Sequence, residues 1–224
     1  MALSTYSELK SSIANFLNRS DLTTEIQDDF IKLVEADFNS KLRIRQMEQN
    51  DDVTINAETV AVPSGFIAVR SFHILSADTK YHLEYISPAN LFKIKGSSTT
   101  GLPRVYTIES DDGTESIRFA PTPDSTYTGY LQYYKAFDAL SSSNTTNYIL
   151  TNHPAIYLYG SLYHASNFLG GIEPNQQQQW LGMYQAAMER CENNDRTDSY
   201  GASPTVQRTD VSTDLSFYRR KASS

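Results

Sequence analysis

The order of helix-like and strand-like patterns along the chain constrains its fold more than any other feature. Apolar residues recur at helical spacing in residues 1–49 and again in 151–196, whereas residues 50–150 carry strand-like patterns. The two helical regions must pack on each other to bury their apolar faces, which makes the strand-rich region an insertion. We therefore expect an α+β fold: a discontinuous bundle of two N-terminal and two C-terminal helices, with an inserted antiparallel β-sandwich or barrel-like domain.

A polar tail occupies residues 197–224 and holds too little apolar surface to fold alone. We interpret it as an extended C-terminal arm, the fourth segment after the two parts of the bundle and the β domain. Two aromatic residues beside three cations near its end are typical of a docking peptide, with a solvated chain end as the alternative. These residues are Phe217, Tyr218, Arg219, Arg220 and Lys221.

Capping patterns predict where the two N-terminal helices begin. Thr5-x-x-Glu8 and Thr24-x-x-Gln27 both have the spacing of a capping box, in which two side chains satisfy the first backbone N–H groups. We expect the second helix to end in the basic stretch that begins at Lys41. Its predicted buried stripe consists of Ile26, Phe30, Leu33, Val34 and Phe38.

The clearest local pattern of the inserted region predicts a β-hairpin. Residues 104–108 and 116–119 read as strands and flank Asp111-Asp112-Gly113, a turn whose residues tolerate positive φ. Residues 81–85 alternate as a half-buried strand should. Several such segments at regular spacing favour a small antiparallel sandwich or partly open barrel.

Composition excludes several classes of protein. Hydrophobic residues at 39% and charged residues at 20% are ordinary for a soluble protein, and no apolar run approaches the length of a membrane span. The net charge of −7 argues against sequence-independent binding of nucleic acid. With Cys191 as the sole cysteine and no signal-peptide pattern, we expect a protein made in a cytoplasm without an intrachain disulfide.

Patterns that carry enzyme chemistry are absent from the sequence. It has no phosphate-binding loop, dinucleotide fingerprint or nucleophile elbow. His73 and His82 lie on neighbouring strand candidates and could meet, but no third metal ligand accompanies them. Asp111 and Asp112 read as turn residues, not as a catalytic pair. We therefore predict no catalytic residue, no cofactor and no metal site.

One basic cluster stands out within the folded part of the chain. It consists of Lys41, Arg43 and Arg45, at the expected C-terminus of the second helix. Cations at that position compensate the helix dipole, which is one reading. The other reading is a contact with another subunit or a partner protein, because Lys41 and Arg45 lie one helical turn apart.

Several segments, taken together and in order, resemble the head-to-tail adaptor (connector) proteins of tailed bacteriophages, especially the short-tailed ones. The resemblance covers most of residues 5–190. The segments that carry it are Phe30–Asn39, Leu42–Glu48, Val62–Phe66, Gly101–Tyr106, Tyr133-Tyr134, Leu140-Ser141, Asn147–Leu150 and Pro154–Gly160.

This resemblance implies a structural protein of the virion, at the junction of head and tail. In that family about a dozen copies form a ring beneath the portal protein, and the C-terminal arms reach onto portal subunits. The ring extends the DNA channel and offers its lower face to tail and nozzle proteins. Within this reading we expect the basic cluster to contact another subunit or the portal, and the negative charge to let genomic DNA pass without specific binding. We expect no membrane partner, because no apolar run is long enough for a span.

Two alternatives remain open at this point. One is a virion-associated cell-wall hydrolase or glycan-binding module, with the β region as the carbohydrate binder. The other is a stopper or nozzle subunit on the tail side of the adaptor. The adaptor reading further predicts that the free protein is mainly monomeric and forms rings on the portal, because a docking arm orders only when its partner is present.

Overall fold

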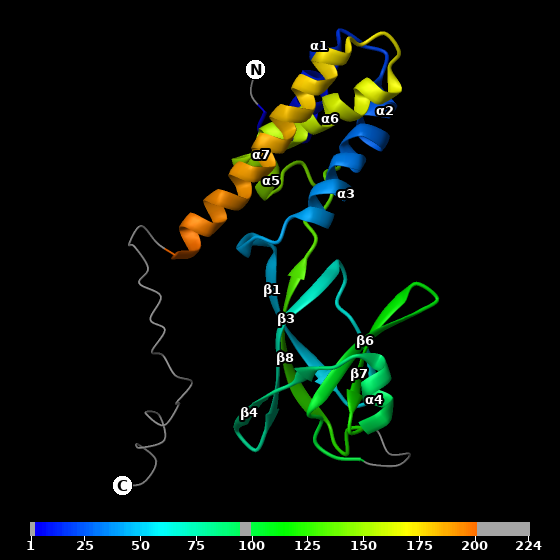
Figure 1. The fold of residues 1–224 in the computed structure, drawn as a ribbon, viewed down its shortest axis with the longest axis vertical. Helices are drawn as coiled ribbons and strands as arrows, with labels where there is room; N and C mark the ends of the chain where they lie inside the picture. Colours follow the sequence, from blue (N-terminus) through cyan, green and yellow to red (C-terminus); the bar gives the residue numbers. More distant parts are fainter. Residues whose placement is uncertain (1–2, 95–99, 201–224) are drawn as a thin grey trace.

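The computed structural model describes residues 3–94 and 100–200, in which helices and strands form two parts that lie end to end (Figure 1). The helical part combines both ends of the described chain, and the strands lie between them in the sequence. The chain passes from the helical part to the strands after α3 and returns after β8 (Figure 1). This mixed fold with an inserted strand region is the one that the sequence predicts.

The helical part contains a second helix that is continuous from α2 to α3 through one π-helical turn. The helices and helical turns of this part are α1 Tyr6–Leu17, α2 Thr23–Glu25, the π-helical turn η1 Ile26–Phe30, α3 Ile31–Lys41, the 3₁₀ turn η2 Arg45–Met47, α5 Tyr148–Asn152, α6 Pro154–Phe168 and α7 Pro174–Tyr200.

The strand part consists of two sheets and one short helix. Its elements are β1 Glu48–Ile55, β2 Thr59–Ala61, β3 Phe66–Ser76, β4 Thr79–His82, β5 Glu84–Tyr85, α4 Pro88–Ile94, β6 Val105–Asp111, β7 Thr114–Ala120 and β8 Tyr127–Lys135. One sheet has the order β1-β8-β3-β4 and is antiparallel throughout. The other has the order β2-β7-β6-β5, in which β5 runs parallel to β6.

The two predicted capping boxes have different outcomes. Thr5 accepts a hydrogen bond from the backbone N–H of Glu8 (3.3 Å), and Glu8 accepts one from the N–H of Thr5 (3.1 Å), which confirms the first. The second is wrong, because α2 begins at Thr23 with Leu22 at its N-cap and without a capping side chain. Leu22 is only 5% exposed, so burial of this residue fixes the start of the helix.

Helix α6 lies at the centre of the helical core. Ile156, Tyr157 and Leu162 of this helix are fully buried. The ring of Tyr157 packs edge-on against Phe38 of α3, with centroids 5.4 Å apart. A helix that buries residues around most of its circumference must be enclosed by its neighbours, as α6 is by α1, α3 and α7.

The two sheets pack face to face and enclose a second core. Phe72 of β3 is fully buried and contacts rings of the opposite sheet, with centroids 5.4 Å from Tyr106 and 5.8 Å from Phe119. Ile55 and Leu131 fill the same layer from the neighbouring strands. The inserted region is therefore a β-sandwich.

The predicted β-hairpin is confirmed, and the strand predicted over residues 81–85 is corrected. Strands β6 and β7 are joined by Asp112 and Gly113, both with positive φ (47° and 75°), as a tight hairpin turn requires. Residues 81–85 are split between the two sheets. Residues 79–82 pair with β3 of the first sheet, and residues 84–85 pair with β6 of the second. The residue between them, Leu83, is 1% exposed, and its burial accompanies the crossing of the chain from one sheet to the other.

A buried carboxylate ties α3 to the segment that returns from β8. Glu35 is 6% exposed and accepts hydrogen bonds from the Leu140 N–H (2.7 Å) and the Tyr157 hydroxyl (3.0 Å). Asn147 donates to the Tyr157 oxygen (2.7 Å) and caps α5 by accepting from the Leu150 N–H (3.0 Å). Burial raises the pKa of Glu35 above its ordinary value, although both hydrogen bonds act in the opposite direction.

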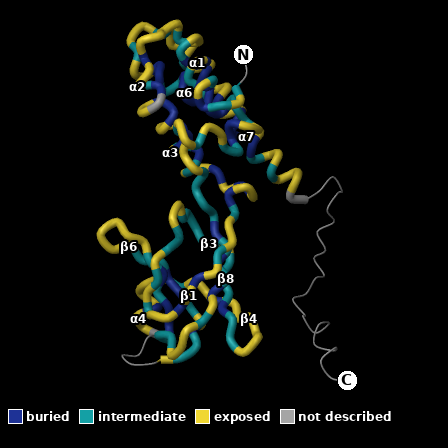
Figure 2. The backbone as a smooth tube through the Cα atoms, turned by 180° about the vertical axis from the view of Figure 1, so that it is seen from behind, coloured by how far each residue is buried: buried dark blue, intermediate teal, exposed yellow. Residues whose placement is uncertain are grey.

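Figure 2 shows how far each described residue is buried. The tip of the β6–β7 hairpin and residues 196–198 of α7 are exposed (Figure 2). Residues 197–200, which the sequence assigns to the arm, form the last turn of α7. The predicted arm contacts at Phe217–Lys221 lie outside the described residues.

Candidate interaction surfaces

The basic cluster predicted from the sequence lies at the end of α3, and two of its cations have partners nearby in the chain. The Lys41 Nζ lies 2.6 Å from the Asp37 carboxylate, and the Arg43 guanidinium donates to the Asn39 carbonyl oxygen at 2.9 Å. Burial alone would raise the pKa of Asp37, but hydrogen bonds from Lys41 and Tyr184 hold it below its ordinary value. Of the two contacts, that of Arg43 satisfies a carbonyl oxygen of the last helical turn. A role of the cluster at another subunit or the portal stays a prediction.

Arg45 makes a contact that joins distant parts of the sequence. Its backbone N–H donates to the Asp195 carboxylate at 3.1 Å, and its guanidinium Nε lies 3.3 Å from the same oxygen. Asp198 lies 4.0 Å from the guanidinium. The C-terminal end of α7 is thereby fixed against η2, three residues before the strand part begins. Sequence reasoning could not find this pairing, because 150 residues separate its members.

We expect Arg45→Ala to lower the free energy of unfolding by about 1 kcal/mol, because the Asp195 side chain is only 15% exposed and would lose a charged partner. Lys32→Ala is the matched control. It breaks an ion pair with Asp28 whose side chains are 64% and 48% exposed, so solvent screens the pair and its loss should have a clearly smaller effect than Arg45→Ala. Urea unfolding of both variants measures the difference. Equal losses would show that Arg45 does not anchor α7.

An open groove with exposed apolar side chains lies along α3, beside α6 and α7. Leu33 and Phe168 are 49% and 60% exposed. Two adjoining cavities of about 490 Å³ each share Leu33 and His164 in their lining. The expected place of Leu33 in the buried stripe is therefore wrong. Val34 and Phe38 face the core, and Leu33, about 100° away from Val34 around the helix, faces the groove. Exposed apolar side chains beside such a groove indicate an interaction surface.

The π-helical turn and a histidine complete this groove. The turn from Ile26 to Phe30 places the Phe30 ring beneath Phe168, with centroids 5.7 Å apart and an edge-on geometry. His164 has a buried Nε2 atom without a hydrogen-bond partner within the described part of the chain. Desolvation lowers the pKa of His164, which favours a neutral ring. The sequence carries no signal for the π turn.

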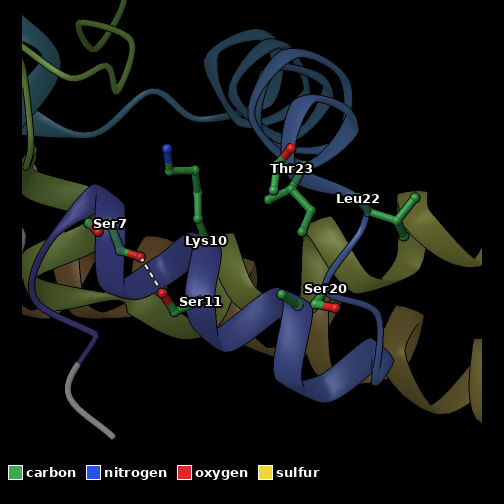
Figure 3. Close-up of a pocket in the computed structure, with 8 residues that line it drawn as sticks. Ser7, Lys10, Ser11, Ser20, Leu22 and Thr23 are labelled. Atoms are coloured by element: carbon green, nitrogen blue, oxygen red, sulfur yellow. Dashed lines mark hydrogen bonds between the residues drawn. The ribbon is translucent and has the colours of Figure 1, made fainter.

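A second hollow lies between α1 and α2 (Figure 3). It measures about 380 Å³ and is lined mainly by hydroxyl groups and Lys10. The Ser11 hydroxyl donates to the Ser7 carbonyl oxygen at 3.0 Å, and the Lys10 ammonium lies 4.6 Å from the centre of the Tyr6 ring. Both side chains are held in local contacts, so the hollow has no arrangement of a nucleophile and a base.

The two histidines that the sequence places on neighbouring strands do meet. His73 and His82 are direct partners in the β3–β4 pairing, with ring centroids 5.1 Å apart. Within residues 3–94 and 100–200, no three side chains of the types that bind metals gather at one point. In the same residues, no helix has the length and apolar character that crossing a membrane requires.

Comparison with known proteins identifies the family. A family model described as SU10 adaptor protein matches residues 4–208, which include both helical regions and the whole strand region. No curated protein matches the chain. The resemblance to phage head-to-tail adaptors that the ordered segments indicate is thereby confirmed.

Proposed function

We propose a head-to-tail adaptor function for this chain, which belongs to the SU10 adaptor protein family. The family places it among the structural proteins of phage particles, with portal and tail components as the class of partner. Our proposal is that about twelve copies form a ring beneath the portal. The ring would extend the DNA channel and provide the platform to which tail and nozzle proteins attach.

The observation that carries this proposal is the length of the family match, because it covers the bundle and the inserted sandwich together. The geometry supports it in two ways. The groove beside Leu33 and Phe168 offers an apolar surface for a neighbouring subunit. The Arg45–Asp195 contact holds the end of α7, from which residues 201–224 continue as the proposed portal-binding arm.

Charge supports the proposed path of the DNA. A net charge of −7 on each copy would give a ring a strongly negative surface. Tight binding to phosphates requires basic side chains that release counterions, so a negative lining would let DNA slide through. We propose that genomic DNA passes through the channel without specific binding.

Sedimentation velocity with the portal ring of the same phage tests the proposal. We expect the full chain alone to sediment as a monomer and to co-sediment with portal. A chain truncated after Tyr200 should lose this binding, although it keeps the contacts of Arg45 with Asp195 and Asp198. A stable ring without portal would contradict the monomer expectation. A full-length chain that does not co-sediment with the portal ring would contradict the adaptor proposal.

Two full-length variants locate the arm contact. Phe217→Ala combined with Tyr218→Ala should weaken portal binding at least about tenfold, since buried aromatic side chains dominate small interfaces. Thr205→Ala combined with Val206→Ala, elsewhere in the arm, is the matched control and should bind as the natural chain does. If both pairs weaken binding equally, the contact is not centred on Phe217 and Tyr218.

The alternative functions receive no specific support from the described residues. Asp111 and Asp112 lie at an exposed hairpin tip, as expected of turn residues. Glu58 and Glu109 both form ion pairs with Arg118 on the second sheet, so these two carboxylates are held by a cation. The observations therefore favour the adaptor over a wall hydrolase.

A further inference from the structure

The four-stranded sheet β1-β8-β3-β4 has two open edges. Strand β1 pairs with β8 alone and β4 pairs with β3 alone, so within the described residues each has one side along which no strand lies. The β3–β4 hairpin projects at the margin of the strand part (Figure 1), and all four residues of β4 are exposed. Unpaired backbone N–H and C=O groups at such edges can accept a strand from another chain.

The two edges differ in charge. Strand β1 contains three carboxylates and no cation, whereas β4 contains Lys80 and His82 and no carboxylate. Like charges opposite each other destabilise a pair of strands, and opposite charges stabilise it. Pairing of β1 with β1, or of β4 with β4, is therefore disfavoured between two copies of the chain. Pairing of β1 of one copy with β4 of another is favoured.

Asp52 is the carboxylate of β1 that is available for such a contact. Glu48 forms an ion pair with Arg70, and Asp51 accepts a hydrogen bond from the Tyr133 hydroxyl at 2.7 Å. The Asp52 residue is exposed, and its carboxylate has no ion pair in the part of the chain that the structure describes.

One row of residues crosses the whole sheet and ends at both edges. It runs from Asp52 through Tyr130 and His73 to His82, which are successive partners in the three strand pairings. Because all three pairings are antiparallel, β1 and β4 run in opposite directions. Neighbouring copies in a ring of about twelve differ by a rotation of about 30°, so β1 of the next copy would run antiparallel to β4.

We propose that β1 of one copy adds to β4 of the next copy as an antiparallel strand, with Asp52 opposite His82. This inference rests on the proposed ring and specifies a surface through which its subunits meet. Only four residues of β4 take part, so the contact is weak between free chains. It forms when the portal holds neighbouring copies at a high effective concentration.

The proposed register agrees with the two faces of the sheet. Tyr81 is the partner of the buried Ile74 and so faces the sandwich core, as Val53 of β1 does. Tyr81 then lies opposite Val53 of the next copy, which places an aromatic ring beside a β-branched side chain. The contact covers Tyr81, which is 41% exposed in the single chain. On the outer face, Lys80 lies opposite Thr54 and diagonal to the carboxylate of β1.

A pair of cysteines tests this contact in the full-length protein assembled on the portal ring. In the proposed register, the Cα atoms of Thr54 in one copy and Lys80 in the next lie about 5 Å apart, which suits a disulfide. Within one chain, three strand spacings separate them by about 14 Å, so no intrachain disulfide can form. Mild oxidation of the variant Thr54→Cys with Lys80→Cys should give a ladder of covalent multimers on a non-reducing gel. Neither single variant should give species larger than a dimer.

Asn50→Cys with Lys80→Cys is the matched control. Asn50 is exposed on the same face of β1 but lies four residues from position 54, about 13 Å along the strand, so this pair should not cross-link. A third substitution tests the charges. Adding His82→Glu to the first cysteine pair places a carboxylate opposite Asp52 and should lower the yield of multimers about fivefold. Adding Asp52→Lys as well should restore the yield.

The outcomes separate this inference from the adaptor proposal. A portal complex that gives no ladder overturns the strand contact, as do equal ladders from the two cysteine pairs. Cross-linking that stops at dimers also overturns it, because a head-to-tail contact continues from copy to copy. A yield that His82→Glu leaves unchanged overturns the placement of Asp52 opposite His82. Failure of the natural chain to form the portal complex contradicts the adaptor proposal instead.

Discussion

Replacing Glu35 by alanine is expected to lower the free energy of unfolding by about 3 kcal/mol. Two donors, the Leu140 N–H and the Tyr157 hydroxyl, converge on the same carboxylate oxygen in a buried site. In the alanine variant, both donors lose their acceptor at a buried position where water does not take its place. The loss is large because this buried carboxylate joins α3, α6 and the segment returning from the sandwich.

The variant Glu35→Gln separates hydrogen bonding from charge. Glutamine keeps an oxygen that accepts both hydrogen bonds, and it does not titrate. Burial raises the pKa of Glu35 above 4.5, so the folded protein holds this proton more tightly than the unfolded chain. The stability that the proton contributes is fully present below pH 4.5 and is lost as the pH rises through the folded pKa. We therefore expect the glutamine variant to gain stability, relative to the natural chain, across this window.

Urea unfolding of the three proteins between pH 4.5 and pH 8 checks both expectations. Constant slopes against urea are required, so that a change of midpoint reports stability. Equal losses for alanine and glutamine would show that the hydrogen bonds of Glu35 are not the source of the effect. A difference between glutamine and the natural chain that does not vary with pH would contradict the raised pKa.

Features of the fold that depend on local sequence could be predicted. The capping box at Thr5 needs only residues within one turn, and the β6–β7 hairpin needs only the turn residues Asp112 and Gly113. The insertion of the sandwich follows from a similarly simple argument, because helical segments at both ends of the described chain require each other for burial.

Features that depend on tertiary packing could not be predicted. The second helix begins at Thr23 because Leu22 is buried against distant residues, which overrides the local pattern at Thr24. Leu33 lies beside apolar residues in the sequence but faces the groove. In the sequence, Arg45 cannot be distinguished from the two other cations of its cluster. Only the fold shows that α7 places Asp195 beside it. The portal contacts of the arm depend on a second protein and stay predictions.

Replacing Gly160 by alanine is expected to destabilise the protein by about 2 kcal/mol, although alanine is the better helix former. A Cβ atom at this position would lie 2.8 Å from Cγ2 of Val34 and 3.1 Å from Cε2 of Tyr184. Val34 is fully buried and its branched side chain has one preferred rotamer in a helix, so it cannot move aside. The helices α3, α6 and α7 meet at this point, and separating them opens the helical core.

Gly182→Ala provides the matched control within a helix. Apart from its chain neighbours and the backbone of its own helix, no described residue places an atom within 4 Å of a Cβ at Gly182, so alanine there should stabilise the protein by about 0.5–1 kcal/mol through helix propensity alone. The two substitutions are chemically identical and both lie inside helices, and their effects should have opposite signs in thermal or urea unfolding. Stabilisation by Gly160→Ala would show that α3 and α7 yield to the added methyl group, and that close contact of these helices is not what holds the bundle together.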